Sequence, residues 1–237
     1  RVRGIARNPK RLRDRPWRSQ MDVVEADLTD PVATRAALEG VDVAYYLVHS
    51  LSADSTFAAR DRRTALTFAQ AAREAGVSRI VYLGGMHPEA GPGELSDHLE
   101  SRKEIGEILL ASGVPTAALQ AAVILGSGSA SFEMMRYLTE RLPAMVAPRW
   151  VETRIQPIAV RDVLRYLVGA ADLPTELSRT FDIAGPEVLT YRDMIQRYAK
   201  VAGLPRRVIV RVPLLTPRLS SLWVGLVTPV PSSIARP

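Results

Sequence analysis

The chain contains no cysteine, which excludes disulfide bonds and thiolate ligands for a metal. Its three histidines do not have the spacing of a metal site, so we expect no bound metal. Long apolar runs are also missing. The most apolar late stretch, 219–234, is interrupted by Pro229 and Pro231 and is shorter than the ~20 residues of a spanning helix. These absences predict a protein without a membrane span, and the lack of cysteine fits a cytoplasmic location.

A glycine-rich phosphate loop is absent too, because no G-x-G-x-x-G spacing occurs in the 237 residues. Residues 1–9 instead form a short apolar strand and a basic turn. That is the pattern of the second strand in a dinucleotide-binding α/β unit. We therefore expect the first strand, the glycine-rich turn and the helix that holds the pyrophosphate to lie just before residue 1.

Basic residues exceed acidic ones, 31 against 25, which gives a formal net charge of +6 and a pI near 10.0. Two interpretations fit this excess: binding to nucleic acid or an anionic membrane surface, or an arginine-rich enzyme with a phosphate-bearing ligand. The sequence has no basic stripe interleaved with aromatic residues and no helix-turn-helix pattern. We therefore favour the second interpretation and expect no nucleic-acid partner.

Strand and helix patterns alternate along the first half of the chain. Expected strands cover 2–6, 21–26, 43–48, 79–83 and 116–125, and expected helices cover 31–38, 53–75 and 99–111. The runs at 43–48 and 79–83 have the apolar character of strands buried on both faces. This order predicts an α/β fold with a doubly wound parallel sheet, an extended Rossmann fold whose first βα unit is missing.

After Gly126 the loops become longer and proline becomes more frequent. Helices are expected at 131–141, 160–171, 191–202 and 213–227, and short strands at 154–158, 180–183 and 207–211. We divide the chain into a dinucleotide-binding core, 1–128, and a segment 129–237 that combines a small substrate lobe with additions to the sheet.

The ends of the expected strands carry the candidate ligand-binding residues, because ligands of doubly wound sheets bind outside the carboxyl ends of the strands. Arg7 follows the first strand, where a guanidinium suits the 2′-phosphate of NADP. Asp27 is suited to accept a hydrogen bond from adenine, and Leu28 to cover the ring. The alternatives are a solvated arginine at position 7 and a carboxylate at position 27 that only begins the next turn.

Two further strand ends suit the middle and the reactive end of a dinucleotide. Val48, His49 and Ser50 follow the most apolar strand, so the backbone there approaches the ribose and pyrophosphate. Gly84 and Gly85 permit close approach of a ligand to the backbone and would line a nicotinamide pocket.

The helix expected at 99–111 opens with His98 and Arg102, four residues apart on one face. Histidine exchanges protons near neutral pH, whereas arginine stays charged and binds ribose or phosphate. We predict His98 and Arg102 as the catalytic pair, with Arg102 also a cofactor ligand. The alternative is a charged helical turn that faces solvent.

Several segments resemble a known family. They are Y-Y-L-V-H-S-L at 45–51, R-I-V-Y-L-G-G at 79–85, H-L-x-S-R at 98–102, S-G-V-P-T at 112–116, F-D-I-A-G-P-E at 181–187 and the proline-rich run 227–237. These segments are similar to the atypical short-chain dehydrogenase/reductases, and most of all to the bacterial NAD(P)H-binding, NmrA-like branch. The resemblance extends over nearly the whole chain.

The resemblance implies a dinucleotide across the strand ends, NADP(H) with NAD(H) as the alternative, and a C-terminal substrate lobe. It also implies an additional C-terminal domain beyond Pro237, so that the chain is an internal fragment. In typical reductases of this class a Tyr and a Lys stand where this chain has His98 and Arg102, and a Ser stands near Gly84 and Gly85.

The resemblance and these departures leave three functions open. The first is an NADPH-dependent oxidoreductase acting on an apolar carbonyl or enone, with His98 as proton donor. The second is a non-catalytic NADP(H) sensor or scaffold, and the third is a sugar-nucleotide epimerase or isomerase. The third normally requires the Tyr–Lys pair, so we rank it last. The substrate is a small molecule that the sequence does not identify, and a homodimer stays open.

Overall fold

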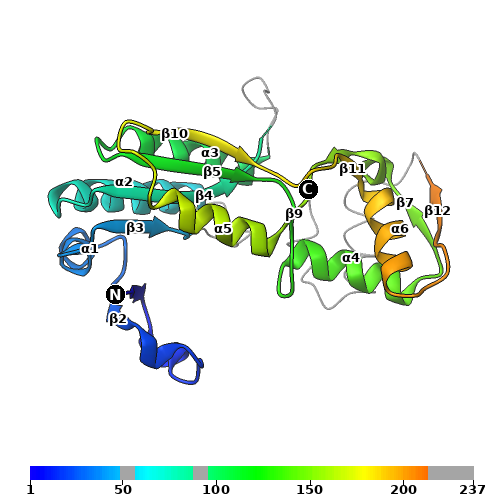
Figure 1. The fold of residues 1–237 in the computed structure, drawn as a ribbon, viewed down its shortest axis with the longest axis horizontal. Helices are drawn as coiled ribbons and strands as arrows, with labels where there is room; N and C mark the ends of the chain where they lie inside the picture. Colours follow the sequence, from blue (N-terminus) through cyan, green and yellow to red (C-terminus); the bar gives the residue numbers. More distant parts are fainter. Residues whose placement is uncertain (49–56, 88–95, 213–237) are drawn as a thin grey trace.

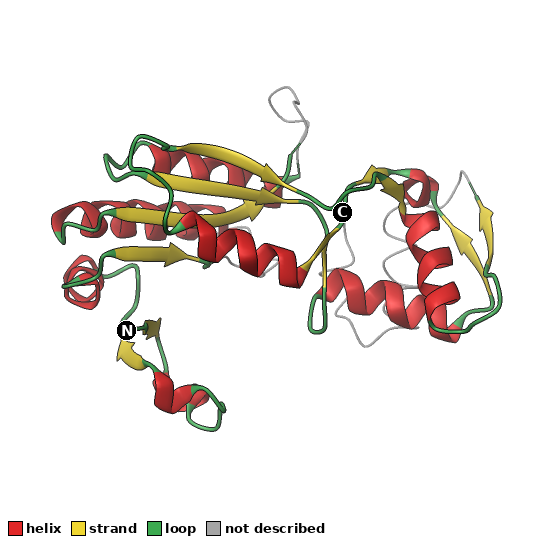
Figure 2. Ribbon diagram, viewed as in Figure 1, coloured by secondary structure: helices red, strands yellow, loops and turns green. Residues whose placement is uncertain are grey.

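The computed structural model describes residues 1–48, 57–87 and 96–212. Its central element is a sheet of four parallel strands in the order β10–β5–β4–β3. These strands are β3 (Val43–Tyr46), β4 (Arg79–Gly85), β5 (Thr116–Ala121) and β10 (Arg179–Ile183). Their carboxyl ends point toward a smaller group of helices and strands at one end of the molecule (Figure 2).

Helices cover both faces of this sheet (Figure 1). The helices α2 (Phe57–Glu74) and α3 (Asp97–Leu110) lie on one face, and α5 (Val160–Ala170) lies on the other. Tyr82 and Ala118 pack under α2 and α3, while Val81 and Leu119 pack under α5. Both faces of β4 and β5 are therefore buried, which explains their unbroken apolar sequences. The predicted α/β fold with a doubly wound parallel sheet is confirmed.

The first two strands form a separate small sheet. β1 (Arg3–Ala6) and β2 (Asp22–Glu25) pair in parallel with each other, and the short turns η1 (Pro9–Leu12) and η2 (Arg18–Gln20) connect them. Within the described residues, neither strand pairs with the four-stranded sheet. β1 and β3 therefore each have one edge without a partner strand in this part of the chain.

The helix α1 (Pro31–Leu38) joins the two sheets and has the boundaries that the sequence predicts. The Asp30 carboxylate accepts hydrogen bonds from the backbone N–H groups of Val32 and Ala33, at 2.9 and 3.2 Å. Pro31 occupies the first turn, where its missing N–H costs nothing. The Arg3 side chain donates to the carbonyl of Ala37, at 3.1 Å, which holds β1 against the end of α1.

A smaller group of elements, here called the lobe, lies beyond the carboxyl ends of the four-stranded sheet (Figure 1). The lobe consists of α4 (Ala130–Arg141), β7 (Ala144–Ala147), η3 (Arg149–Glu152), β8 (Arg154–Ile155), β11 (Leu189–Thr190), α6 (Tyr191–Val201) and β12 (Val208–Arg211). Its core contains Met135, Met145, Met194 and Ile195. The short parallel pair β6 (Ile124–Leu125) and β9 (Ile158–Ala159) leads from the sheet to the lobe.

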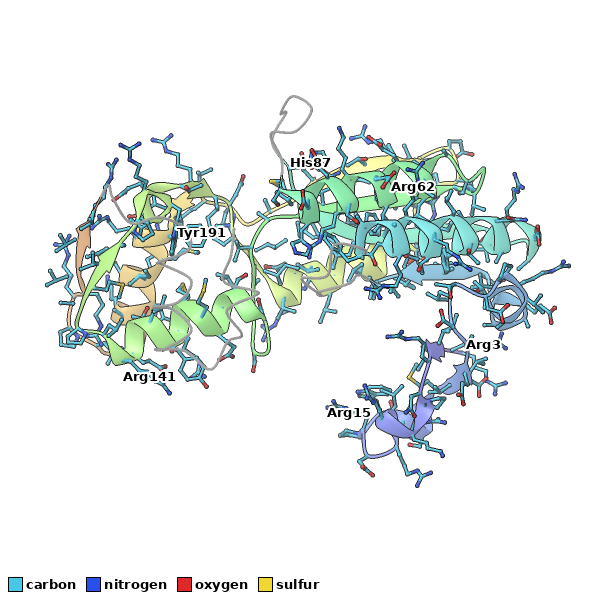
Figure 3. All side chains as sticks on the ribbon, turned by 180° about the vertical axis from the view of Figure 1, so that it is seen from behind. Arg3, Arg15, Arg62, His87, Arg141 and Tyr191 are labelled. Carbon is cyan, nitrogen blue, oxygen red and sulfur yellow. The ribbon has the colours of Figure 1, made fainter. Side chains whose placement is uncertain are left out.

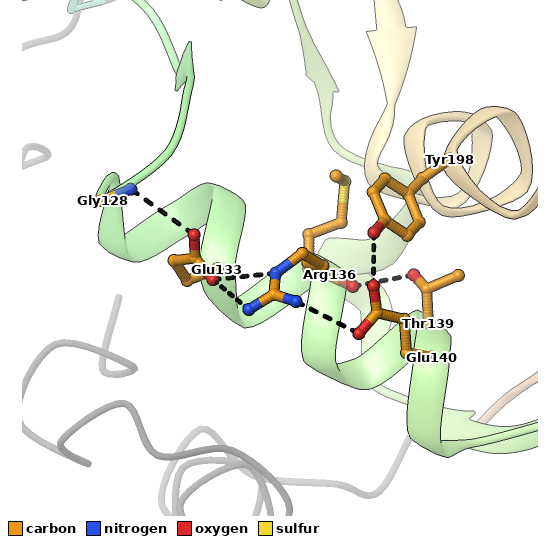
Figure 4. A network of polar contacts seen from close by, with 7 residues as sticks. Gly128, Glu133, Arg136, Thr139, Glu140 and Tyr198 are labelled. Atoms are coloured by element: carbon orange, nitrogen blue, oxygen red, sulfur yellow. Dashed lines mark hydrogen bonds and ion pairs between the residues drawn. The ribbon is translucent and has the colours of Figure 1, made fainter. Parts of the chain in front are cut away.

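A polar network joins the two helices of the lobe (Figure 4). Arg136 on α4 donates to Glu133 at 2.7 Å and to Glu140 at 3.3 Å, and the hydroxyl of Tyr198 on α6 donates to Glu140 at 2.5 Å. The hydrogen bond from Arg136 holds the pKa of Glu133 below its ordinary value. Glu140 thus links the charged face of α4 to α6, and the network is structural.

Most element predictions are confirmed, but several differ. The strand expected at 154–158 is two short strands, β8 and β9, and β11 was not predicted. The strand expected at 116–125 ends at Ala121 and resumes as β6. β7 was not predicted, because four residues between Pro143 and Pro148 carry no usable periodicity. The helix expected at 213–227 and the first residues of the helix expected at 53–75 lie outside the described residues. In the ranges that are described, no helix is long and apolar enough to cross a membrane.

Candidate functional site

The ends of β1 and β2 bring Arg7 close enough to Asp27 for their charges to interact. The backbone N–H and the hydroxyl of Thr29 both donate to Asp27 Oδ1, at 2.9 and 2.8 Å. These hydrogen bonds lower the pKa of Asp27 below its ordinary value, and the charges of Arg7 and Arg63 lower it further. Asp27 therefore carries a stable negative charge beside two exposed guanidinium groups.

Sequence analysis did not single out Arg63. Arg63 lies on α2, and in the sequence it belongs to a charged run, 60–63, that reads as a solvated helix face. Its charge reaches Asp27 because α2 packs beside α1, which follows directly after Asp27. Only this tertiary contact distinguishes Arg63 from its neighbours.

The remaining predicted residues at this side of the site differ in burial. Leu28 is half-buried and packs against the main core. Val48 follows β3 and is 47% exposed, so its backbone and side chain are accessible. His49 and Ser50 lie outside the described residues.

Gly84 makes room for the ring of Tyr82. Gly84 and Tyr82 are two residues apart on β4, so both lie on the face of the sheet that α3 covers. A Cβ on Gly84 would lie 2.8 Å from the Tyr82 ring, and one on Gly106 of α3 would lie 3.5 Å from it. The Tyr82 hydroxyl donates to the carbonyl of Arg102, at 2.9 Å. The missing side chain at position 84 therefore lets Tyr82 link β4 to α3.

We expect Gly84→Ala to displace the Tyr82 ring and weaken its hydrogen bond to Arg102. Overpacking of this kind costs about 1–3 kcal/mol, measurable as a lower midpoint in urea. Gly106→Ala is the matched control, because its Cβ would make an ordinary contact in a helix that favours alanine. A urea midpoint for Gly84→Ala at or above that for Gly106→Ala would show that the Tyr82 ring has free space to move into.

Gly85 lies under the side chain of Arg102. A Cβ on Gly85 would lie 3.2 Å from Arg102 Nη1 and 3.2 Å from Leu99 Cδ2. The structure thus brings together two of the predicted site residues at the carboxyl end of β4. A guanidinium in this place can bind a ribose hydroxyl or a phosphate but does not exchange protons.

Tyr82 is the tyrosine in contact with Arg102, and it is not an activated phenol. Burial raises the pKa of Tyr82 to about 12, and the charge of Arg102 offsets this only in part. A phenol that acts as a proton donor near neutral pH needs a lowered pKa. Tyr82 and Arg102 therefore do not replace the Tyr–Lys pair of typical reductases.

His98 is exposed and stacks on Phe57, the first residue of α2. Their ring centroids are 4.5 Å apart, with an angle of 29° between the ring planes. His98 and Arg102 thus point to different neighbours, Phe57 for the one and Gly85 for the other. Both remain at the opening of α3, beside the end of β4.

A second histidine at this end, His87, was not predicted as a site residue. It follows the end of β4, close to the lobe (Figure 3), and its Nε2 lies 3.0 Å from Nε2 of Gln120 on β5. A sequence signal existed: Gln120 interrupts the otherwise apolar end of a buried strand. A polar side chain in such a place usually has a buried polar partner.

A groove of about 590 Å³ runs along the outer side of α2 and α3. It is lined by residues that include Arg62, Leu66, Gln70, Arg73 and Ile108. It is wide open to solvent, and of the side chains that we assign to the strand-end site it includes Arg63 alone. We therefore place the functional site at the strand ends, where the fold predicts ligand binding and the side chains suit a dinucleotide.

The side chains at the strand ends fit parts of a dinucleotide. Arg7 and Arg63 suit a phosphate, Asp27 suits an amino group, and Arg102 suits a ribose or phosphate oxygen. The G-x-G-x-x-G turn that would grip the pyrophosphate is not in the sequence. The chain therefore has side chains suited to the two ends of a dinucleotide, but it lacks the glycine-rich turn for the pyrophosphate between them.

A doubly wound parallel sheet with these side chains at its carboxyl edge defines a dinucleotide-binding α/β protein. Residues 1–125 match the family model described as NAD(P)H-binding, and the chain belongs to this family. The predicted cofactor class is thereby confirmed.

The chain is also similar to individual proteins. It is 27% identical over 207 residues to a (4-alkanoyl-5-oxo-2,5-dihydrofuran-3-yl)methyl phosphate reductase of Streptomyces griseus, covering 87% of this chain and 67% of that protein. Among solved structures it resembles the triphenylmethane reductase of Citrobacter sp. in complex with NADP(H), with a TM-score of 0.74, 18% identity, and coverage of 99% and 78%. A nucleoside-diphosphate-sugar epimerase of Staphylococcus aureus gives a TM-score of 0.71 at 15% identity, with coverage of 98% and 78%. These two structural likenesses show the fold.

Proposed function

We propose that the protein is an NADPH-dependent oxidoreductase of the atypical short-chain dehydrogenase/reductase class, in its NmrA-like branch. The observation that carries this proposal is Arg7 beside Asp27 at the β1–β2 strand ends of an NAD(P)H-binding chain. A guanidinium after this strand suits the 2′-phosphate of NADP, whereas enzymes specific for NAD prefer an acidic residue there. The reductase of Streptomyces griseus and the NADP(H) complex of the Citrobacter enzyme support the same choice.

The cofactor would extend along the carboxyl edge of the sheet. Arg7 holds the 2′-phosphate, and Asp27 and Leu28 hold the adenine. The other predicted ligands are Val48, His49 and Ser50 for the ribose and pyrophosphate, and Gly84, Gly85 and Arg102 for the nicotinamide end. Bound NADPH would supply a hydride, while Arg102 orients the bound molecules by its fixed charge and His98 is the predicted proton donor.

The proposed substrate is an apolar carbonyl or enone. The substrate named for the Streptomyces griseus relative contains a ring C=C bond conjugated to two carbonyl groups, as in an enone, and it also carries a phosphate group. In this chain we assign residues 1–128 to cofactor binding and the lobe within 129–237 to the substrate. The lobe's position beyond the strand ends supports this division (Figure 1).

We further infer that a strand–turn–helix unit upstream of residue 1 completes the cofactor site. The unpaired edges of β1 and β3 support this inference, because one more strand between them would join the two sheets into one. Tyr45 and Leu47, next to the edge of β3, are 42% and 49% exposed, which leaves apolar surface for a helix of that unit to cover. An additional C-terminal domain and a homodimer stay predictions.

A non-catalytic NADP(H) sensor is the second candidate. It is favoured by one observation: the tyrosine beside Arg102 has a raised pKa and its hydroxyl is bonded to a backbone carbonyl. A sensor would bind NADPH through Arg7 and show no turnover with any carbonyl or enone acceptor.

We expect Arg7→Ala to weaken NADPH binding about 30-fold and to leave NADH binding nearly unchanged, because only NADPH carries the 2′-phosphate. Fluorescence titration with both nucleotides measures this, on the 237-residue chain and on a form extended upstream. Arg15→Ala is the matched control, since Arg15 is another exposed arginine in the connection between β1 and β2. An equal loss for NADPH and NADH would contradict the role of Arg7. Absence of NADPH binding in both forms would overturn the proposed function.

A further inference from the structure

Gln120 is a polar side chain in the middle of the sheet's carboxyl edge. β5 lies between β4 and β10, and Gln120 is paired in register with Gly84 of β4. Its neighbours on the strand, Leu119 and Ala121, are buried, whereas Gln120 is partly exposed. The Gln120 amide contacts His87, which follows the end of β4.

The backbone holds His87 close to this edge. The N–H of Met86 donates to the carbonyl of Ala121, at 2.8 Å, so pairing between β4 and β5 continues one residue past Gly85. His87 is the next residue, and it is partly buried. Its position is therefore fixed from two sides, by the strand pairing and by the Gln120 side chain.

The contact between Gln120 and Nε2 of His87 depends on which ring nitrogen carries the proton. The Gln120 amide nitrogen can only donate, so Nε2 of His87 accepts and the neutral ring carries its proton on Nδ1. If the ring becomes doubly protonated, a rotated amide presents its oxygen to Nε2–H instead. Gln120 can thus keep its contact with both forms of a histidine that gains and loses a proton.

The other side chains at this edge are less suited to donate a proton. The phenol of Tyr82 is bonded to a backbone carbonyl, Arg102 stays charged, and the ring of His98 is stacked on Phe57. His87 combines a titratable ring, a partner that sets its orientation, and a place beyond the glycines of β4.

We propose that His87 is the proton donor of the reaction and that Gln120 is its positioning residue. This inference rests on the proposed reductase function. As a hydride forms a C–H bond on the acceptor, the acceptor π bond breaks and its electron pair moves to the carbonyl oxygen. The doubly protonated ring of His87 transfers its Nδ1 proton to that oxygen. The Nδ1–H bond breaks as the O–H bond forms, and a neutral ring is left with its Nε2–H bonded to the Gln120 amide oxygen; solvent then reprotonates Nδ1. NADPH is the reductant: its nicotinamide C–H bond breaks as the hydride leaves with two electrons, and His87 supplies the proton, so the acceptor gains two electrons and two hydrogens.

The activity test compares His87→Gln, His98→Gln and Gln120→Leu in the form of the protein that binds NADPH, with an α,β-unsaturated ketone bearing an alkyl chain as probe. We expect His87→Gln to lower kcat about 100-fold with NADPH affinity within about twofold of the parent. Gln120→Leu should lower kcat less, with KM little changed, and Gln70→Leu on the outer side of α2 is its control. Full activity of His87→Gln, with loss in His98→Gln, would overturn the inference and leave the reductase proposal standing. An inactive parent that still binds NADPH would overturn both.

A second measurement needs neither cofactor nor turnover. Nitrogen-15 NMR of the His87 ring reports which nitrogen carries the proton, and we expect the Nδ1–H tautomer in the parent. Gln120→Leu should shift the ring toward the Nε2–H tautomer, while Gln70→Leu should not. An Nε2–H tautomer in the parent would overturn the hydrogen bond from the Gln120 amide to His87 Nε2, and with it the positioning role of Gln120, whatever the activity.

Discussion

Gly185→Ala is expected to destabilise the protein strongly. Gly185 follows β10, and a Cβ at this position would collide with the backbone carbonyl oxygen of Pro157. That carbonyl accepts a hydrogen bond from the Gly185 N–H, at 3.1 Å, and the side chain of Gln156 donates to the Gly185 carbonyl, at 2.7 Å. Because the obstacle is backbone, an added methyl group must push two chain segments apart and break both hydrogen bonds.

We expect a loss of about 3 kcal/mol in the free energy of unfolding, which lowers Tm by about 6–12 °C in a chain of this size. Thermal unfolding followed by circular dichroism measures it. Gly169→Ala, near the end of α5, is the matched control, because a Cβ there meets nothing within 4 Å and alanine favours a helix. If both variants melt like the parent, the junction between β10 and the β8–β9 segment is looser than the structure shows.

Arg79→Met is expected to cost about 4 kcal/mol, from the loss of several hydrogen bonds to a charged donor. Arg79, the first residue of β4, is 2% exposed. Its guanidinium donates to three carbonyl oxygens in the segment before β10, those of Leu173, Pro174 and Leu177, at 2.8, 2.7 and 3.3 Å. Methionine fills the space of the buried side chain but leaves these carbonyl oxygens without their charged donor.

Urea unfolding with a fixed m-value provides the measurement for Arg79. Arg35→Met is the control, since Arg35 is exposed and forms only a 3.6 Å ion pair with Glu74, for which we expect a change within about 0.5 kcal/mol. Arg79→Lys should fall between parent and Arg79→Met, because one ammonium cannot reach all three carbonyls. A loss for Arg79→Met no larger than that for Arg35→Met would mean that the carbonyls find water instead.

Both sites explain how the last strand of the sheet is held in place. β10 comes from residues 179–183, far along the chain from β5, and pairs with it in parallel. Arg79 holds the segment before β10 through hydrogen bonds, and Gly185 permits close packing of the segment after it. The lobe continues from the segment that follows Gly185, so its position beyond the strand ends depends on the contacts of Gly185.

The sequence by itself determined the elements and the class of fold. Unbroken apolar runs identified β3, β4 and β5, because strands buried on both faces need no polar alternation. Capping residues located helix boundaries, as Asp30 and Pro31 did for α1. The side chains Arg7 and Asp27 were also found from sequence, because the end of a parallel strand is a local feature that a fold rule connects with ligand binding.

The tertiary structure alone decided which side chains meet. Arg63 beside Asp27, Tyr82 with Arg102, and His87 with Gln120 join elements that are separate in the sequence. No local pattern encodes these contacts, because each depends on strand order and on how helices pack over the sheet. The burial of Arg79 has the same cause. From the sequence, a charged residue at the start of a strand is expected to be exposed. Arg79 is buried because a segment nearly a hundred residues later packs over it.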